Sequence, residues 1–206
     1  MREIVYVVLA AGASQRMGFA KAVTPLGGKS PLERLGAVLE GRAVTIVAAE
    51  PLAPACSLAM PWASVLVNTR PFEGMSSSLL VAHRAIARGA TLAVMLADKP
   101  FVQRQTLDLC ERALEVCAAC DVLYPTAAGE RGHPVYFGPA ARARLAAIPS
   151  GDTLRAVRDD QRLSALAVEC QDAGVLIDLD TPEAWQAAER RLQDESSVER
   201  EARRHA

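Results

Sequence analysis

Apolar residues follow two periodicities along this chain, and the two kinds of segment alternate. Short apolar runs rich in β-branched residues, bounded by turn residues, predict strands. These runs are Ile4–Leu9, Ala43–Ala48, Ser64–Val67, Thr91–Leu96, Val122–Tyr124 and Val175–Ile177. Segments with helical spacing are Pro31–Leu39, Ser76–Arg88, Gln103–Cys117, Pro139–Ala147 and Pro182–Leu192. This alternation predicts an α/β fold with a mostly parallel sheet, helices on both faces, and ligands beyond the carboxyl ends of the strands.

Two further segments affect the domain organisation. Residues 51–61 are rich in Pro and Ala, which predicts a loop or a short helix between two strands. Residues 194–206 mix both charges with no apolar residue except Val198 and alanines, which predicts a frayed helix or a disordered tail. A chain of 206 residues is within the size of one domain, which we expect to span residues 1–193.

Composition excludes several classes of function. The formal net charge is -1, so there is no broad basic field for nucleic acid. Charged residues interrupt every long apolar run before the roughly 20 residues that a membrane span needs. Five cysteines are an odd count without a secretory context, which favours reduced thiols, and the lone Cys117-x-x-Cys120 pair lacks further zinc ligands. We therefore expect a soluble, cytoplasmic protein.

The loop after the first strand carries the strongest chemical signal. Residues 9–18 read Leu-Ala-Ala-Gly-Ala-Ser-Gln-Arg-Met-Gly, and Lys21 follows. Small residues let backbone amides approach an anion, while Arg16 and Lys21 add positive charge, so the loop suits a triphosphate. The spacing fits neither the dinucleotide fingerprint nor a P-loop. A tight strand-to-helix turn is the alternative, although it explains the glycines and not the two cations.

Two aspartates follow predicted strands. Asp98 comes just after Thr91–Leu96, and Asp180 follows Val175–Ile177. Carboxylates at this edge of a sheet can hold Mg²⁺, which prefers oxygen ligands and bridges phosphates. Asp180 has an alternative explanation, because an acid before a helix N-terminus is favourable without a metal. We interpret Asp178 as a supporting or solvent-facing residue.

Two other motifs are ambiguous from the residues alone. The serines from Ser76 to Ser78 open a predicted helix, where hydroxyls and free amides can bind a ligand oxygen or simply cap the helix. Glycine is missing from the position that a serine-nucleophile elbow requires, which argues against hydrolase chemistry. His133 is an isolated histidine in Gly132-His133-Pro134, and such residues usually serve surface or packing roles.

The loop at 9–18, together with residues 25–34, resembles the molybdenum cofactor nucleotidyltransferase family. Further motifs of that family are matched in order by Asn68 with residues 74–79, by 96–100, by 132–135 and by 177–183. The resemblance covers roughly residues 4 to 190. It implies a Rossmann-like fold of the nucleotide-diphospho-sugar transferase type, in agreement with the fold predicted from the alternating pattern.

The resemblance also implies roles for individual residues. Lys21 and Arg16 would be catalytic, and Asp98 and Asp180 would bind Mg²⁺. Acceptor binding would fall to Gly132, His133 and Pro134. Nucleotide binding would involve Leu9, Ala10, Ala11, Gly12, Arg16, Lys21, Asn68, Ser76 and Asp98. The family usually has Met at the position of Lys99. A cation at this position would weaken metal binding or contact a phosphate.

The function implied is transfer of CMP from CTP to the phosphate of molybdenum-loaded molybdopterin, with release of pyrophosphate. Ala11 favours CTP over GTP, because guanylyl members tend to have Gly-Gly in this loop. A molybdoenzyme of the xanthine oxidase class, or its accessory protein, would be a partner. The alternatives are guanylyl transfer, nucleotidyl transfer to a sugar or isoprenoid phosphate, and a non-catalytic accessory protein that binds molybdopterin.

Overall fold

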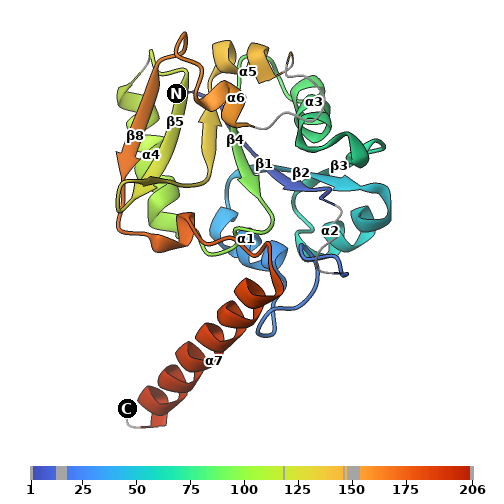
Figure 1. Ribbon diagram of the computed structural model, residues 1–206, viewed down its shortest axis with the longest axis vertical. Helices are drawn as coiled ribbons and strands as arrows, with labels where there is room; N and C mark the ends of the chain where they lie inside the picture. Colours follow the sequence, from blue (N-terminus) through green and yellow to red (C-terminus); the bar gives the residue numbers. More distant parts are fainter. Residues whose placement is uncertain (1, 13–17, 118, 146, 148–153, 205–206) are drawn as a thin grey trace.

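The computed structural model describes residues 2–12, 18–117, 119–145, 147 and 154–204, with side chains described as far as residue 194. In this part of the chain, eight strands form one sheet (Figure 1). They are β1 (Ile4–Ala10), β2 (Ala43–Ala49), β3 (Ser64–Asn68), β4 (Thr91–Leu96), β5 (Val122–Ala127), β6 (Glu130–Arg131), β7 (Val135–Phe137) and β8 (Ala165–Glu169).

The sheet is mostly parallel, as predicted. Its strand order is β3-β2-β1-β4-β7-β5, with β6 and β8 both paired to β5. The first four of these strands run parallel to one another, whereas β7 is antiparallel to both β4 and β5. Because β1 lies between β2 and β4, the chain turns in opposite directions after these strands, which places a ligand crevice at their carboxyl ends.

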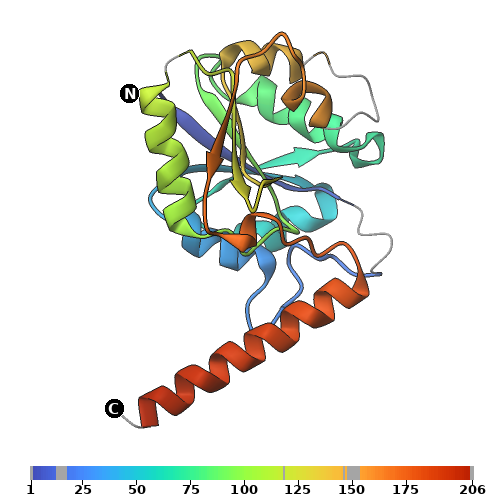
Figure 2. The same cartoon turned by 60° about the vertical axis from the view of Figure 1, so that its left-hand side comes forward.

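Helices cover both faces of the sheet (Figures 1 and 2). The helices are α1 (Pro31–Leu39), α2 (Ala53–Ala59), α3 (Met75–Ala85), α4 (Arg104–Val116), α5 (Pro139–Leu145), α6 (Arg155–Arg158) and α7 (Pro182–Arg204), with 3₁₀ turns η1 (Glu50–Leu52), η2 (Pro71–Glu73) and η3 (Ala173–Val175). Alternate residues of β1 contribute to the two resulting cores. Tyr6 and Val8 pack on the side of α1, α2 and α4, and Val7 and Leu9 on the side of α3, α5 and α6.

Local signals explain the elements that were predicted well. Ser30 and Glu33 form a reciprocal capping box at the start of α1, and Pro31 occupies its first turn. These residues satisfy amides that the helix leaves unpaired, so the helix start is fixed by its own sequence. Both α1 and β4 have the predicted bounds.

The predicted strand at Val175–Ile177 is wrong. This segment begins in η3 (Ala173–Val175) and does not pair in the sheet; Val175 is buried in the core, and Leu176 packs against that core partly buried. The strands β6, β7 and β8 were not predicted. The first two are very short, and β8 lies at the sheet edge with alternate residues exposed, so none forms a long apolar run.

Helix α7 is longer than predicted, because its backbone stays helical past Leu192 to Arg204. Its first turns pack Trp185 and Ala188 against Leu26 and Leu179 in a small separate core. Beyond this contact the helix projects away from the body of the protein (Figures 1 and 2). The division of the chain at residue 193 remains a prediction.

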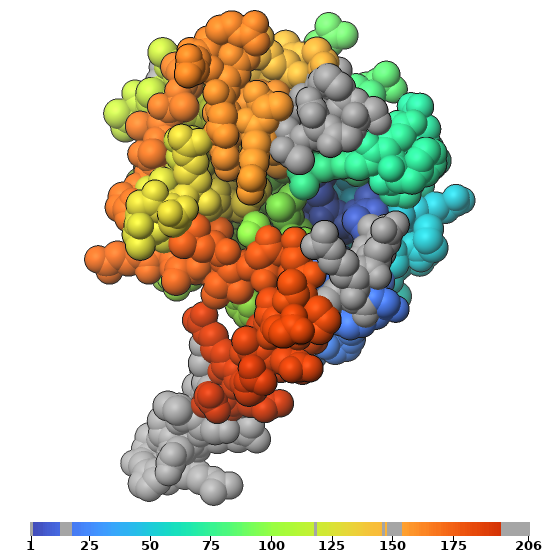
Figure 3. Space-filling model, viewed as in Figure 1, coloured from blue at the N-terminus to red at the C-terminus, as the bar shows by residue number. Residues whose placement is uncertain are grey.

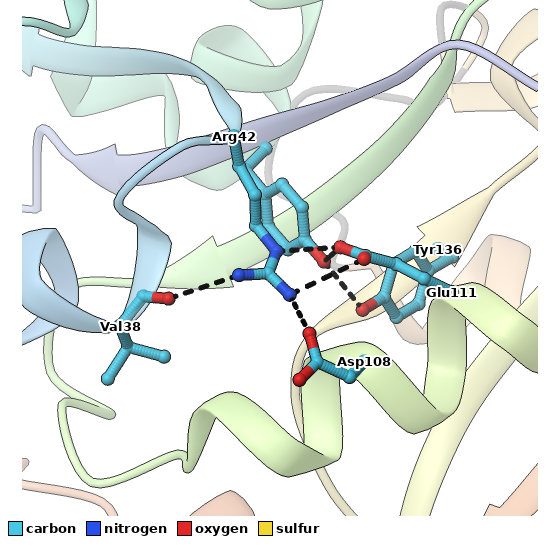
Figure 4. A network of polar contacts seen from close by, with 6 residues as sticks. Val38, Arg42, Asp108, Glu111 and Tyr136 are labelled. Atoms are coloured by element: carbon cyan, nitrogen blue, oxygen red, sulfur yellow. Dashed lines mark hydrogen bonds and ion pairs between the residues drawn. The ribbon is translucent and has the colours of Figure 1, made fainter.

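A partly buried polar network lies near the amino ends of β1 and β2, and Figure 4 shows it from close by. Arg42, just before β2, donates to the Glu111 Oε1 atom at 2.7 Å and contacts Asp108 on α4. Tyr6 of β1 donates to Glu111 and shares a 3.0 Å hydrogen bond with Tyr136 of β7. We call these five side chains the Arg42 network, and it joins α4 to β1, to β7 and to the residue just before β2.

Candidate active site

The carboxyl ends of β1 and β4 form the floor of a cavity. Leu9 lies opposite Leu96 in the parallel pairing, and the amide of Ala97 donates to the carbonyl of Leu9 at 3.1 Å. A cavity of about 280 Å³ opens here, visible as a hollow between the end of β1 and α3 in Figure 3. It is lined by Leu9, Ala11, Gly12, Pro71, Gly74, Met75, Ser78, Leu96 and Asp98. Four of the predicted nucleotide-binding residues, Leu9, Ala11, Gly12 and Asp98, therefore line one cavity, whereas Ala10 and Lys21 do not.

The opposite wall is the start of α3, which hydrogen bonds hold against β3. The Asn68 side-chain amide donates to Ser77 Oγ at 2.8 Å and to Ser78 Oγ at 2.9 Å. Ser76 donates to the carbonyl of Glu73 at 3.4 Å. Neither Asn68 nor Ser76 lines the cavity, whereas Ser78 does. Nucleotide binding by Asn68 and Ser76 stays a prediction, and their contacts are those of residues that support the wall.

Three carboxylates converge beside this cavity. Ligand oxygens of Asp98, Asp178 and Asp180 lie within 4.8 Å of one another. Lys21 Nζ lies 2.6 Å from Asp180 Oδ1 and 3.5 Å from Asp98 Oδ2, while Lys99 Nζ lies 3.0 Å from Asp178 Oδ2. We call these five side chains the carboxylate cluster. Sequence reasoning placed Asp98 and Asp180 together, but it missed Asp178.

The segment that carries Asp178 and Asp180 is held in place by contacts with residues that are distant in the sequence. The amide of Leu179 donates to the carbonyl of Asp98 at 3.0 Å. Upstream, the buried Asp172 carboxylate accepts from the amide of Gln103 at 2.7 Å and from the amide of Gly174 at 2.9 Å. A Cβ atom at Gly174 would lie 1.9 Å from the carbonyl oxygen of Phe101. The segment therefore packs so closely on the loop after β4 that only glycine fits.

Burial and like charge make Asp98 unusual. Desolvation and the negative charge of Asp178 raise the pKa of Asp98 to about 6, against the lowering effect of Lys21. The pKa of Asp180 is lowered, chiefly by its hydrogen bond from Lys21. The buried Oδ1 atoms of Asp98 and Asp178 have no hydrogen-bond partner among the described residues. An unpaired buried oxygen is costly, and a hard divalent cation is the kind of group that satisfies several such oxygens together.

The predicted acceptor motif precedes β7, which pairs with β4 along the edge that β4 does not share with β1. Residues 132–134 join β6 to β7, and the bond between His133 and Pro134 is cis. The amide of His133 donates to the carbonyl of Val175 at 3.2 Å, and a Cβ atom at Gly132 would lie 2.5 Å from the Val175 side chain. Burial, with the positive charge of Lys99, lowers the pKa of His133 to about 4. His133 is thus neutral near pH 7 and close to Lys99.

Arg16 is the one predicted site residue that lies outside the described part of the chain, because residues 13–17 are not among the described residues. Lys21 is placed, with a nearly buried side chain at the centre of the carboxylate cluster. Its charge lies between two carboxylates at the edge of a cavity with space for phosphates. This arrangement is typical of a site that handles a metal-bound polyphosphate.

A family model described as a MobA-like NTP transferase domain matches residues 6–166. The chain belongs to this family. Its members are nucleotidyltransferases, so the resemblance based on the loop at residues 9–18 and the later motifs is confirmed at that level.

Among curated proteins compared by sequence, none matches the chain. Among the described residues, no helix is both long and apolar enough to cross a membrane.

Solved structures share the fold over nearly the whole chain. Rv0371c from Mycobacterium tuberculosis H37Rv is 25% identical, with a TM-score of 0.74 over 92% of this chain and 98% of that one. A manganese complex of the same protein is 24% identical, with a TM-score of 0.69 over 92% and 98%. Molybdopterin-guanine dinucleotide biosynthesis protein A from Archaeoglobus fulgidus is 19% identical, with a TM-score of 0.71 over 92% and 99%. The last two structures are less than 25% identical to this chain, so their similarity shows a shared fold and nothing more.

Proposed function

We propose that this protein transfers CMP from CTP to the phosphate of molybdopterin carrying molybdenum, with release of pyrophosphate. The observation that carries the proposal is the carboxylate cluster, in which three carboxylates meet Lys21 and Asp98 lines the cavity together with Ala11 and Gly12 of the loop after β1. In a family of nucleotidyltransferases, this combination supports a triphosphate and its metal at that edge. The proposed setting is cytoplasmic maturation of a molybdoenzyme of the xanthine oxidase class.

Mg²⁺ is the proposed cofactor, and the residues present fit it. Asp98 and Asp180 would hold the ion, and the unpaired Oδ1 atoms of Asp98 and Asp178 support a third ligand in Asp178. When bound, the ion would supply positive charge that offsets the negative charge developing on the reacting phosphates. The manganese complex of Rv0371c supports a divalent cation in a protein of the same fold.

The reaction requires little proton transfer from the protein. An oxygen of the acceptor phosphate attacks the α-phosphorus of CTP, a new phosphorus–oxygen bond forms, and the bond to the β-phosphate oxygen breaks. Pyrophosphate leaves with the bonding electron pair. A phosphate monoester is largely dianionic near neutral pH, since its second pKa is about 6, so no general base is needed. Lys21, and by proposal Arg16, stabilise charge on the reacting phosphates.

The preference for CTP is proposed from Ala11. Ala11 is one of the residues that line the cavity. Its methyl group would restrict a purine base more than a pyrimidine base. A single methyl group is worth about 1–3 kcal/mol of discrimination. We therefore expect Ala11→Gly to narrow the ratio of kcat/KM for CTP over GTP by roughly 10- to 200-fold at most.

Pyrophosphate release measured with each nucleoside triphosphate tests the proposal. We expect release with CTP only when molybdenum-loaded molybdopterin is present. Lys21→Met should reduce the single-turnover rate at saturating CTP, whereas the matched variant Lys29→Met, at an exposed lysine, should not. Faster release with GTP would replace cytidylyl by guanylyl transfer, and release only with a sugar or isoprenoid phosphate would replace the acceptor. Binding of molybdopterin without any release would indicate an accessory protein.

A further inference from the structure

Of the two cations in the carboxylate cluster, Lys99 lies nearer to the predicted acceptor motif, because it pairs with Asp178 and not with Asp98 or Asp180. Its amide donates to the carbonyl of Leu96 at 3.0 Å, which turns the chain sharply after β4. The side chain is 13% exposed, and Nζ contacts Asp178 Oδ2 at 3.0 Å. Lys99 does not line the cavity on the α3 side of Asp98. Its partner Asp178 instead lies three residues after Val175, whose carbonyl accepts from the amide of His133 at 3.2 Å on the β7 side.

The use of lysine at this position is unusual for this chain. Only three of its 23 Lys and Arg residues are lysines, namely Lys21, Lys29 and Lys99, and two of these belong to the carboxylate cluster. Arginine would offer a planar fork that holds carboxylates through two bonds, as Arg42 does with Glu111. Lysine offers a compact point charge on a flexible stem. Such a cation is suited to exchanging one anion for another.

The charge of the cluster provides a reason for that exchange. In the structure, the two ammonium groups leave one of the three carboxylate charges uncompensated. A divalent cation held by the same carboxylates would reverse the sign and leave a net positive charge. Asp178 would then interact with the metal ion, and the ammonium group of Lys99 would need another anion. On the β7 side, the group that the proposed reaction brings is a phosphate.

We propose that Lys99 binds an oxygen of the acceptor phosphate, exchanging Asp178 for it when a divalent cation occupies the carboxylates. This inference rests on the proposed function, because it assigns the acceptor phosphate to the β7 side of Asp98. Lys99 is then a substrate-binding residue for phosphorylated acceptors. It also competes with the metal ion for Asp178 in the absence of substrate.

Mn²⁺ and inorganic phosphate test the inference without turnover. The unreactive cytidine 5′-(α,β-methylene)triphosphate first fills the nucleotide position, and Mn²⁺ then broadens the ³¹P resonance of any phosphate bound beside it. We expect Lys99→Met to weaken phosphate binding by about 10- to 100-fold, which is the usual effect of losing a hydrogen bond to a charged group. The same variant should bind Mn²⁺ at least as tightly as the wild type, because a competing cation has been removed. Lys29→Met should change neither affinity.

The two opposite effects distinguish phosphate binding from a structural role. If Lys99 only held the loop in place, its loss would weaken phosphate and Mn²⁺ binding together, and the inference would be wrong. Unchanged phosphate binding in Lys99→Met would also overturn it, as would a wild type that binds Mn²⁺ and the nucleotide but no phosphate. A wild type that binds neither Mn²⁺ nor the nucleotide analogue would instead overturn the proposed function, and the inference with it.

Discussion

The Arg42 network and the carboxylate cluster each contain both positive and negative side chains, and they lie at opposite ends of the strands of one sheet. They differ in how many of their buried polar atoms have a hydrogen-bond partner. In the Arg42 network, Glu111 accepts from both Arg42 and Tyr6, and Asp108 pairs with the same guanidinium group (Figure 4). None of its side-chain atoms is buried without a partner. In the carboxylate cluster, the buried Oδ1 atoms of Asp98 and Asp178 have no partner among the described residues.

This difference separates a structural network from a candidate site. A buried polar atom without a partner costs about 1–3 kcal/mol, so a fold optimised for stability alone would pair it, as the Arg42 network does. Like-charged groups at the carboxylate cluster add to the cost, since Asp178 raises the pKa of Asp98. Because these unsatisfied oxygens belong to carboxylates whose oxygens lie within 4.8 Å of one another, they indicate where a ligand contributes the missing interaction.

Matched Asp→Asn substitutions should separate the two clusters most clearly. We expect Asp98→Asn to reduce turnover roughly 10³-fold, because several kcal/mol of metal-dependent stabilisation is lost. The folded-state pKa of Asp98 is about 6, above its usual 3.8, so its charged form opposes folding above pH 6. The metal-free variant should therefore melt roughly 2–4 °C higher at pH 7.5, for a gain of about 1 kcal/mol.

The control is Asp108→Asn, the same change in the Arg42 network. It should leave pyrophosphate release within about threefold of the wild type, a difference below 1 kcal/mol, and lower the melting temperature. A loss of turnover in Asp108→Asn, or a lower melting temperature for metal-free Asp98→Asn, would remove the distinction between the clusters.

Removing the central cation of the Arg42 network should cost stability without affecting chemistry. Arg42→Met leaves Glu111 and Asp108 without their cation, and because both carboxylates are partly exposed we expect a loss of about 2–3 kcal/mol. For a chain of this size, that loss lowers the melting temperature by roughly 5–10 °C. Denaturant unfolding gives the free energy. Nucleotide affinity at 10 °C should match the wild type, and a selective loss of affinity would contradict a purely structural role.

His133 provides a smaller effect, which depends on pH. Its pKa is about 4 in the folded protein and near 6.5 when unfolded, so the unfolded chain takes up the proton first as the pH falls. Stability should therefore decline between pH 6.5 and pH 4, and the contribution from His133 reaches about 2 kcal/mol by pH 5. Urea unfolding at several pH values measures this slope. His133→Gln should flatten it, and an unchanged slope would show that other groups cause the decline.

Much of the fold could be predicted because its signals are local. The capping box of Ser30 and Glu33 defines the start of α1, and the apolar run Thr91–Leu96 defines β4 and places Asp98 at its end. The small residues after β1 marked one wall of the cavity for the same reason. In each case the deciding residues lie within a few positions of one another, so the sequence alone determined the start of α1, the end of β4 and the position of the loop after β1.

Other features depended on contacts between distant parts of the chain. Lys21 meets Asp180 across 159 positions, and Asp172 holds Gln103 across 69. The apolar run near Val175 resembled a strand, but close packing of Gly174 on Phe101 made it a 3₁₀ turn and brought Asp178 into the carboxylate cluster. Only the tertiary structure decided these pairings, because burial and charge at a residue depend on neighbours that its local sequence does not contain.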